Sequence, residues 1–248
     1  MRFFILKKNK KMLQKLFGFN SKETSVRTEV IAGITTFLTM SYILAVNPAM
    51  FGLLDGMPIG SVFTSTALAA IVGCVAMAFY GKLPFALAPA MGLNAFFVYT
   101  VCMGMGYSWQ FALTAGFIEG LIFILLTITN VREAIVNAIP INLRYAVGVG
   151  IGLFIAFIGL QNAGVIVNNE ATLVTLGDVT SGSALLTMMG LIITGLLYVR
   201  NVPGAMMLGI LLTTLVGIPM GVTDFKGIVS QPESIAPIFC QFEWNNIF

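Results

Sequence analysis

Two polar side chains lie in long apolar stretches of the sequence, the amide of Asn94 and the carboxylate of Glu119. An amide both donates and accepts hydrogen bonds, so Asn94 suits a planar ligand with alternating donors and acceptors. A carboxylate in the middle of an apolar segment is either a protonatable coupling group or a partner for a neighbouring helix. On pattern alone, ligand binding and helix packing stay open for Asn94, and proton coupling and helix packing stay open for Glu119.

Asn94 belongs to an interrupted apolar segment, ALAPAMGLNAFF at residues 86–97. Pro84 and Pro89 lack backbone donors and disfavour helix for the residues before them, so LPFALAPA is predicted to be extended. From Gly92 onward the sequence predicts a half-helix of about three turns, too short to cross a bilayer alone. Its N-terminus would present free N–H groups and a positive dipole end, with Asn94 in the first turn. The alternative is a proline-kinked helix whose asparagine bonds a neighbouring helix.

Glycines at a spacing of four residues mark two further segments. Gly116 and Gly120 flank Glu119, and this GxxxG spacing predicts close contact with another helix. Gly148 and Gly152 repeat the spacing, which indicates either close packing or a sliding surface between two bodies.

The first apolar segment carries several hydroxyls and an Asn-Pro pair. Its hydroxyls are expected to bond carbonyls of their own helix rather than line a cavity, and they belong to Thr35, Thr36, Thr39 and Ser41. Asn47-Pro48 predicts a kink or an early helix exit.

The composition identifies an all-α integral membrane protein. Of 248 residues, 58% are hydrophobic and 9% charged, whereas soluble domains carry about a quarter charged residues. Apolar runs predict seven transmembrane segments. They span approximately Val30–Phe51, Ser61–Tyr80, Leu83–Met103, Trp109–Thr129, Leu143–Ala163, Ala184–Val199 and Val202–Met220.

Charge predicts the orientation of these segments. Basic residues crowd the first 28 residues and recur in alternate loops, at Lys82, Arg132, Arg144 and Arg200. The positive-inside rule then makes residues 1–28 a cytoplasmic basic tail and places the end of the seventh segment outside a plasma or inner membrane. A second copy of such a unit would run upside down, as in inverted-repeat transporters.

Several classes of protein are not supported by the sequence. It has no histidine, and its three cysteines have no paired spacing, so neither a metal site nor a disulfide framework is predicted. Phosphate-binding and nucleic-acid motifs are lacking, and no nucleophile–base pair can be assembled. We expect neither an enzyme nor a nucleic-acid-binding protein.

Four stretches together resemble the AzgA-like hypoxanthine/guanine/adenine permeases of the nucleobase transporter superfamily. They read TEVIAGITTFLTMSYILAVNPAMF, GKLPFALAPAMGLNAFFVYTVC, ALTAGFIEGLIFILLT and IPINLRYAVGVGIGLFIAFIGLQNAGVI. The resemblance runs from about Thr28 to the end of the sequence.

The resemblance implies one repeat of a 7+7 inverted-repeat fold, with a short strand plus half-helix as the third segment. Residues 29–130 would form core-domain spans 1–4 and residues 131–222 gate-domain spans 5–7. Residues 223–248 would be an exterior segment leading to a second repeat that is absent from this sequence.

In the family, purine binds between the half-helices of spans three and ten, with acidic residues on spans eight and ten. Only Asn94 has a matching position here. The candidate substrate-binding residues are Asn94 and its neighbours Gly92, Ala95 and Phe96, and Glu119 is a candidate for proton coupling or for a structural role.

The resemblance therefore implies the N-terminal half of a proton-coupled purine uptake permease, with the proton as coupling ion and no other cofactor. Its partners would be a purine nucleobase, the lipid bilayer and the second half of the transporter; a homodimer is a further alternative. An anion carrier of the same fold group and a non-transporting membrane fragment stay open as functions.

Overall fold

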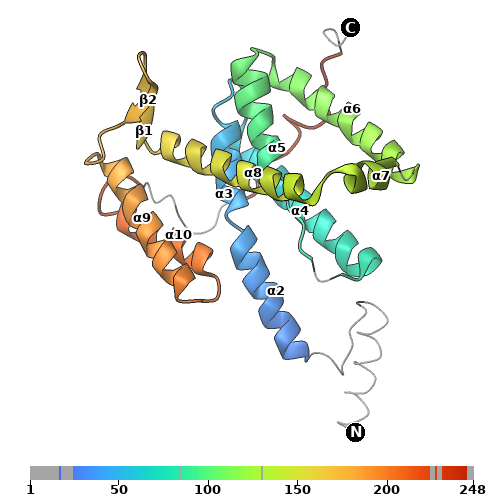
Figure 1. Ribbon diagram of the computed structural model, residues 1–248, viewed down its shortest axis with the longest axis horizontal. Helices are drawn as coiled ribbons and strands as arrows, with labels where there is room; N and C mark the ends of the chain where they lie inside the picture. Colours follow the sequence, from blue (N-terminus) through green and yellow to red (C-terminus); the bar gives the residue numbers. More distant parts are fainter. Residues whose placement is uncertain are drawn as a thin grey trace. The chain divides into compact units, whose positions relative to one another are not determined.

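The computed structural model describes residues 17, 25–83, 85–129, 131–223, 227 and 231–244. Most of the predicted basic tail, together with Pro84, lies outside these residues. The α-helices and strands are labelled in Figure 1. In chain order they are α2 Val26–Met40, α3 Ile43–Phe51, α4 Ile59–Ala76, η1 Met77–Gly81, α5 Met91–Ala95, η2 Phe96–Gly104, α6 Trp109–Ile128, α7 Val131–Ala138, α8 Ile141–Asn162, β1 Ile166–Asn169, β2 Leu173–Leu176, α9 Gly182–Val199 and α10 Ala205–Gly217.

Five helical stretches of the described chain are long and apolar enough to cross a membrane. They are Val26–Phe51, Ile59–Gly81, Trp109–Ile128, Ile141–Asn162 and Gly182–Val199. Two shorter apolar helices, Met91–Gly104 and Ala205–Gly217, fall on the third and seventh predicted segments. The helical membrane architecture is confirmed, whereas the crossing of all seven segments and the inverted-repeat layout stay predictions.

The first apolar segment is broken, as the Asn-Pro pair predicts, but at an earlier position. Helix α2 ends at Met40, two residues form a turn, and α3 then contains Pro48. The Leu44 and Ala45 N–H groups bond carbonyls three residues back, 3.1 and 3.0 Å away. Pro48 crowds the carbonyl four residues before it, that of Leu44, which lies inside α3, so the turn at Ser41 and Tyr42 is not placed by this proline.

The hydroxyls of this segment bond the backbone of their own helix. Thr35 donates to the Ile31 carbonyl at 2.9 Å, and Thr39 donates to the Thr35 carbonyl at 2.8 Å. Thr36 and Ser41 make equivalent bonds to carbonyls four and three residues earlier. The prediction that these groups satisfy their own helix is confirmed.

Two connections between the long helices have structure that the sequence analysis did not predict. Strands β1 and β2 form an antiparallel hairpin, with Asn169 opposite Leu173. The Asn169 side-chain oxygen accepts from the Ala171 and Thr172 N–H groups at 2.9 and 3.0 Å and so shapes the turn. Helix α7 is a short exposed helix between α6 and α8.

The chain after the hairpin is ordered by a side-chain turn. Asp178 accepts hydrogen bonds from the hydroxyl and the N–H of Thr180, at 2.5 and 2.9 Å. These bonds stabilise the carboxylate and hold the pKa of Asp178 below its usual value. The turn leads directly into α9.

The described chain divides into two compact units, comprising residues 1–46, 63–89 and 186–231, and residues 47–62, 90–185 and 232–248. In the second unit, α3, the third segment and α6 meet in a buried apolar cluster of Met50, Leu54, Ala95, Val98, Cys102 and Ala112. The half-helix thus supplies three of the buried side chains in this cluster. The core and gate domains expected at residues 29–130 and 131–222 stay predictions.

In the first unit, α9 and α10 interlock through glycine and threonine. A Cβ atom on Gly209 would lie 2.9 Å from Thr194 Cβ, and one on Gly190 would lie 2.8 Å from Thr213 Oγ1. The two glycines thus allow the helices to approach closely at reciprocal positions.

The glycine pairs that the sequence analysis singled out behave differently. An added Cβ at Gly116, Gly120, Gly148 or Gly152 would meet nothing within 4 Å in the described chain. The close helix contact predicted for Gly116 and Gly120 is therefore not made within the described residues, and for Gly148 and Gly152 close packing and a sliding surface both stay predictions. GxxxG spacing identifies a face that another helix can approach, but not whether a neighbour lies there.

We expect Gly209→Ala to lower the thermal unfolding midpoint of the purified chain in detergent, because overpacking costs about 1–3 kcal/mol. The matched control is Gly195→Ala on α9, where an added Cβ meets nothing within 4 Å. This control should leave the midpoint unchanged or raise it, since alanine is about 1 kcal/mol better than glycine in a helix. Equal shifts in the two variants would contradict the α9–α10 interlock.

Candidate functional site

The third apolar segment changes from extended chain to helix at Met91. Ala90 has extended backbone angles, φ −75° and ψ 113°, and α5 begins at the next residue. Helix α5 continues without a break into the π-helical η2, which ends at Gly104. The described residues before it, 85–90, form neither helix nor strand. The predicted extended stretch and half-helix are thus present, and residues 85–90 are not paired as a strand in the described chain.

Asn94 lies in the first turn of this half-helix and bonds a neighbouring helix. Its Nδ2 donates to Oδ1 of Asn47 in α3, with a distance of 2.9 Å between the two atoms. Asn94 is half-buried, whereas Asn47 is 2% exposed. The half-helix and the asparagine bond were alternatives on pattern alone, and the structure contains both.

The other three candidate substrate-binding residues have different surroundings. Gly92 faces α8, where an added Cβ would lie 3.2 Å from Ile151 Cγ2. Ala95 is 1% exposed within the apolar cluster, and Phe96 is 51% exposed. Gly92 and Ala95 therefore seat the half-helix against its neighbours, while contact of any of the three with a substrate stays a prediction.

A second polar contact holds the half-helix further along. The Asn162 side-chain amide at the end of α8 donates to the Tyr99 hydroxyl of η2 at 3.3 Å. The sequence analysis missed both Tyr99 and Asn47 as partners of this segment. The Asn-Pro pair was the only signal, and it was interpreted as a backbone feature.

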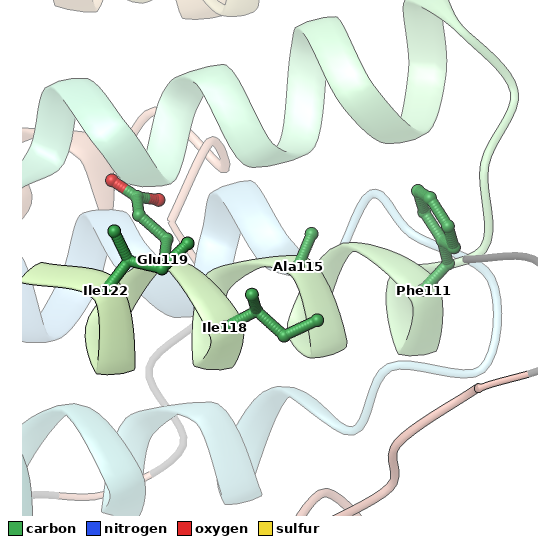
Figure 2. Close-up of a pocket in the computed structure, with 5 residues that line it drawn as sticks. All are labelled: Phe111, Ala115, Ile118, Glu119 and Ile122. Atoms are coloured by element: carbon green, nitrogen blue, oxygen red, sulfur yellow. The ribbon is translucent and has the colours of Figure 1, made fainter. Parts of the chain in front are cut away.

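Glu119 lines a hollow of about 330 Å³ on α6 (Figure 2). The other lining residues are all from the same helix: Phe111, Ala115, Ile118 and Ile122. Residues 111, 115 and 119 are spaced by four, so their side chains form one stripe along the helix. The carboxylate thus lies in an apolar depression that does not include Asn94.

Phe242 and Glu243 pack along α6. Ser108, the N-cap of α6, accepts from the Phe111 N–H at 3.1 Å and donates to the Glu243 carboxylate. The Glu243 N–H donates to the buried Thr114 hydroxyl at 2.9 Å, and the Phe242 ring lies 4.8 Å from that of Phe117. Phe242 and Glu243 of the predicted exterior segment are therefore held against α6, while the Ser234 carbonyl accepts from the Ser61 hydroxyl of α4 at 2.7 Å.

These features define a multi-pass helical membrane protein whose first and third apolar segments are interrupted. Comparison of the sequence with known proteins identifies the family. Residues 27–247 match the Permease family, and the chain belongs to it.

Three relatives illustrate the match. The chain is 49% identical over 234 residues to a putative permease of Methanocaldococcus jannaschii, an alignment that covers 94% of the chain and 53% of that protein. It is 46% identical over 227 residues to the adenine permease AdeP of Escherichia coli, covering 92% and 51%. It is 47% identical over 238 residues to the guanine/hypoxanthine permease PbuG of Bacillus subtilis, covering 92% and 54%.

The chain therefore spans about half the length of these relatives, which it matches as an N-terminal half. The resemblance to purine permeases is confirmed, and the relatives are named as transporters rather than enzymes.

We expect Gly92→Val to lower the thermal midpoint of the purified chain, because the added side chain meets Ile151 of α8. Adding Ile151→Ala should restore part of the loss by making room. Gly150→Val is the matched control, since a Cβ there meets nothing within 4 Å. Failure of Ile151→Ala to relieve the effect of Gly92→Val would contradict the packing of the half-helix on α8.

Proposed function

We propose that the chain is the first half of a proton-coupled permease that takes up the purine nucleobases hypoxanthine, guanine or adenine across the cell membrane. The observation that carries the proposal is the Asn94 amide, held by Asn47 in the first turn of a half-helix. Relatives named as adenine and guanine/hypoxanthine permeases support the choice of substrate class.

The chemistry of the amide suits a purine edge. One N–H of Asn94 Nδ2 is bonded to Asn47, and the Oδ1 of the same amide is the acceptor that remains for an N–H of the base. Discontinuous helices form the substrate sites of many transporters, since backbone without helical bonds is tolerated at membrane depth only beside protein or a cavity.

A neutral base fits the site better than an anion. The sequence contains no lysine or arginine from Leu83 to Val131, which includes the half-helix and all of α6. An anion carrier, the alternative function, would gain only the dipole of the half-helix there.

The rest of the transporter follows from the same proposal. The seven apolar segments cross the membrane with the N-terminus in the cytoplasm, as the distribution of basic residues indicates. A second half supplies the opposing half-helix and the acidic residues that hold the base and couple the proton. In this arrangement the chain contributes one side of the binding site.

We expect Asn94→Ala to raise the KM for radiolabelled hypoxanthine by about tenfold, the effect of losing a hydrogen bond worth about 1.4 kcal/mol. The assay uses cells deficient in purine uptake that express the complete protein containing residues 1–248, with the amount in the membrane measured. Asn168→Ala, on the exposed strand β1, is the control and should leave KM unchanged. An unchanged KM in Asn94→Ala would remove this residue from the site.

A separate variant distinguishes the two roles of Glu119. Because the other residues that line its hollow on α6 are apolar, we propose that Glu119 has a structural role. Glu119→Gln should then retain both hypoxanthine uptake and its dependence on external pH, whereas Glu119→Leu should reduce the amount of protein in the membrane. Loss of the pH dependence in Glu119→Gln would instead assign proton coupling to this residue.

A further inference from the structure

We propose that Asn47 is a positioning residue. Its hydrogen bond fixes which end of the Asn94 amide is left for a ligand, so that the site selects ligands that present a hydrogen-bond donor. The inference deepens the proposed function and rests on it. It assigns a role to a residue on α3, 47 positions before the residue that it orients.

Asn47 is placed to act on Asn94. Its side chain is 2% exposed, and it precedes Pro48 in α3. On the same helix, Met50 packs in the apolar cluster that also contains Ala95 of the half-helix. The Asn47 amide is therefore held on a packed helix beside the first turn of the half-helix.

The hydrogen bond between the two amides has a direction. Asn47 Oδ1 can only accept, so it bonds the Nδ2 end of the Asn94 amide, and their separation is 2.9 Å. An unrestrained amide has nearly the same shape in both orientations and would offer either end to a ligand. With Asn47 Oδ1 as the acceptor, this freedom is removed, and Asn94 Oδ1 is not the atom that bonds Asn47.

Asn94 Oδ1 is accessible. Among the described residues no buried side-chain nitrogen or oxygen lacks a hydrogen-bond partner, and Asn94 Oδ1 takes part in none of the bonds described there. This oxygen therefore lies at the accessible surface of the half-buried residue. A site with a fixed acceptor favours a ligand N–H at that position and disfavours a ligand that presents a lone pair or a methyl group.

Competition by methylated purines provides the test. The assay is hypoxanthine uptake by the complete protein in cells deficient in purine uptake, with 1-, 7- and 9-methylhypoxanthine as competitors. In the unmodified protein, at least one derivative should compete about tenfold more weakly than hypoxanthine, because a methyl group replaces the N–H that Asn94 accepts.

Two variants of Asn47 separate positioning from packing. Asn47→Leu removes the acceptor, so the KM for hypoxanthine should rise about three- to tenfold. The methyl penalty, which is the factor by which the methylated derivative competes more weakly than hypoxanthine, should fall by a similar factor. Asn47→Asp keeps an acceptor in the same place and should stay within about twofold of the unmodified protein in both measurements. In an Asn94→Ala background, Asn47→Leu should add little, since residues that act through one another are not additive.

Failure of the role of Asn47 can be told apart from failure of the proposed function. An unchanged KM and an unchanged methyl penalty in Asn47→Leu would overturn the role of Asn47 and leave the proposed function in place. A full additional loss in the double variant, or equal losses in Asn47→Leu and Asn47→Asp, would also overturn it. No uptake by the unmodified protein would contradict the proposed function and, with it, this role. The amount of each variant in the membrane is measured in parallel, and Asn47→Asp provides the comparison if Asn47→Leu does not accumulate.

Discussion

The half-helix at Met91–Gly104 is the constraint on which the second unit depends. A helix that starts inside an apolar segment leaves backbone groups without partners at its first turn, and such backbone must be surrounded by protein or line a cavity. Neighbouring elements hold this helix in place: Asn47 of α3 bonds Asn94, and Ile151 of α8 lies against Gly92. Its buried face, which includes Val98, packs in the apolar cluster with α3 and α6.

The surrounding elements are themselves fixed by this arrangement. Helix α6 supplies Ala112 to the cluster and is capped at its start by Ser108, which the Glu243 carboxylate bonds in turn. The end of α8 is tied to η2 through Asn162 and Tyr99. The apolar 18-residue stretch of α8 that could cross a membrane nevertheless has no buried residue in the described chain. This surface is available to lipid or to further protein, as expected for a chain that spans half the length of its relatives.

The sequence predicted what local rules determine. The end of the extended stretch after Pro89 and the start of the half-helix follow from proline stereochemistry, and the backbone bonds of Thr35 and Thr39 follow from their positions in a helix. Contacts between distant positions were not predictable in this way. The Asn47–Asn94 bond joins residues 47 positions apart, and the approach of Gly209 to Thr194 depends on how two helices pack. Gly148 and Gly152 have the spacing of a packed face but no neighbour in the described chain.

In the proposed site, Asn94, oriented by Asn47, accepts a hydrogen bond from a purine. An electron cryo-microscopy structure of the complete protein with hypoxanthine bound would show this contact. We predict a purine nitrogen within about 3.2 Å of Asn94 Oδ1, while Nδ2 of the same amide stays bonded to Asn47. Hypoxanthine bound away from the half-helix, or an Asn94 amide that has released Asn47 to bind the base, would contradict the account.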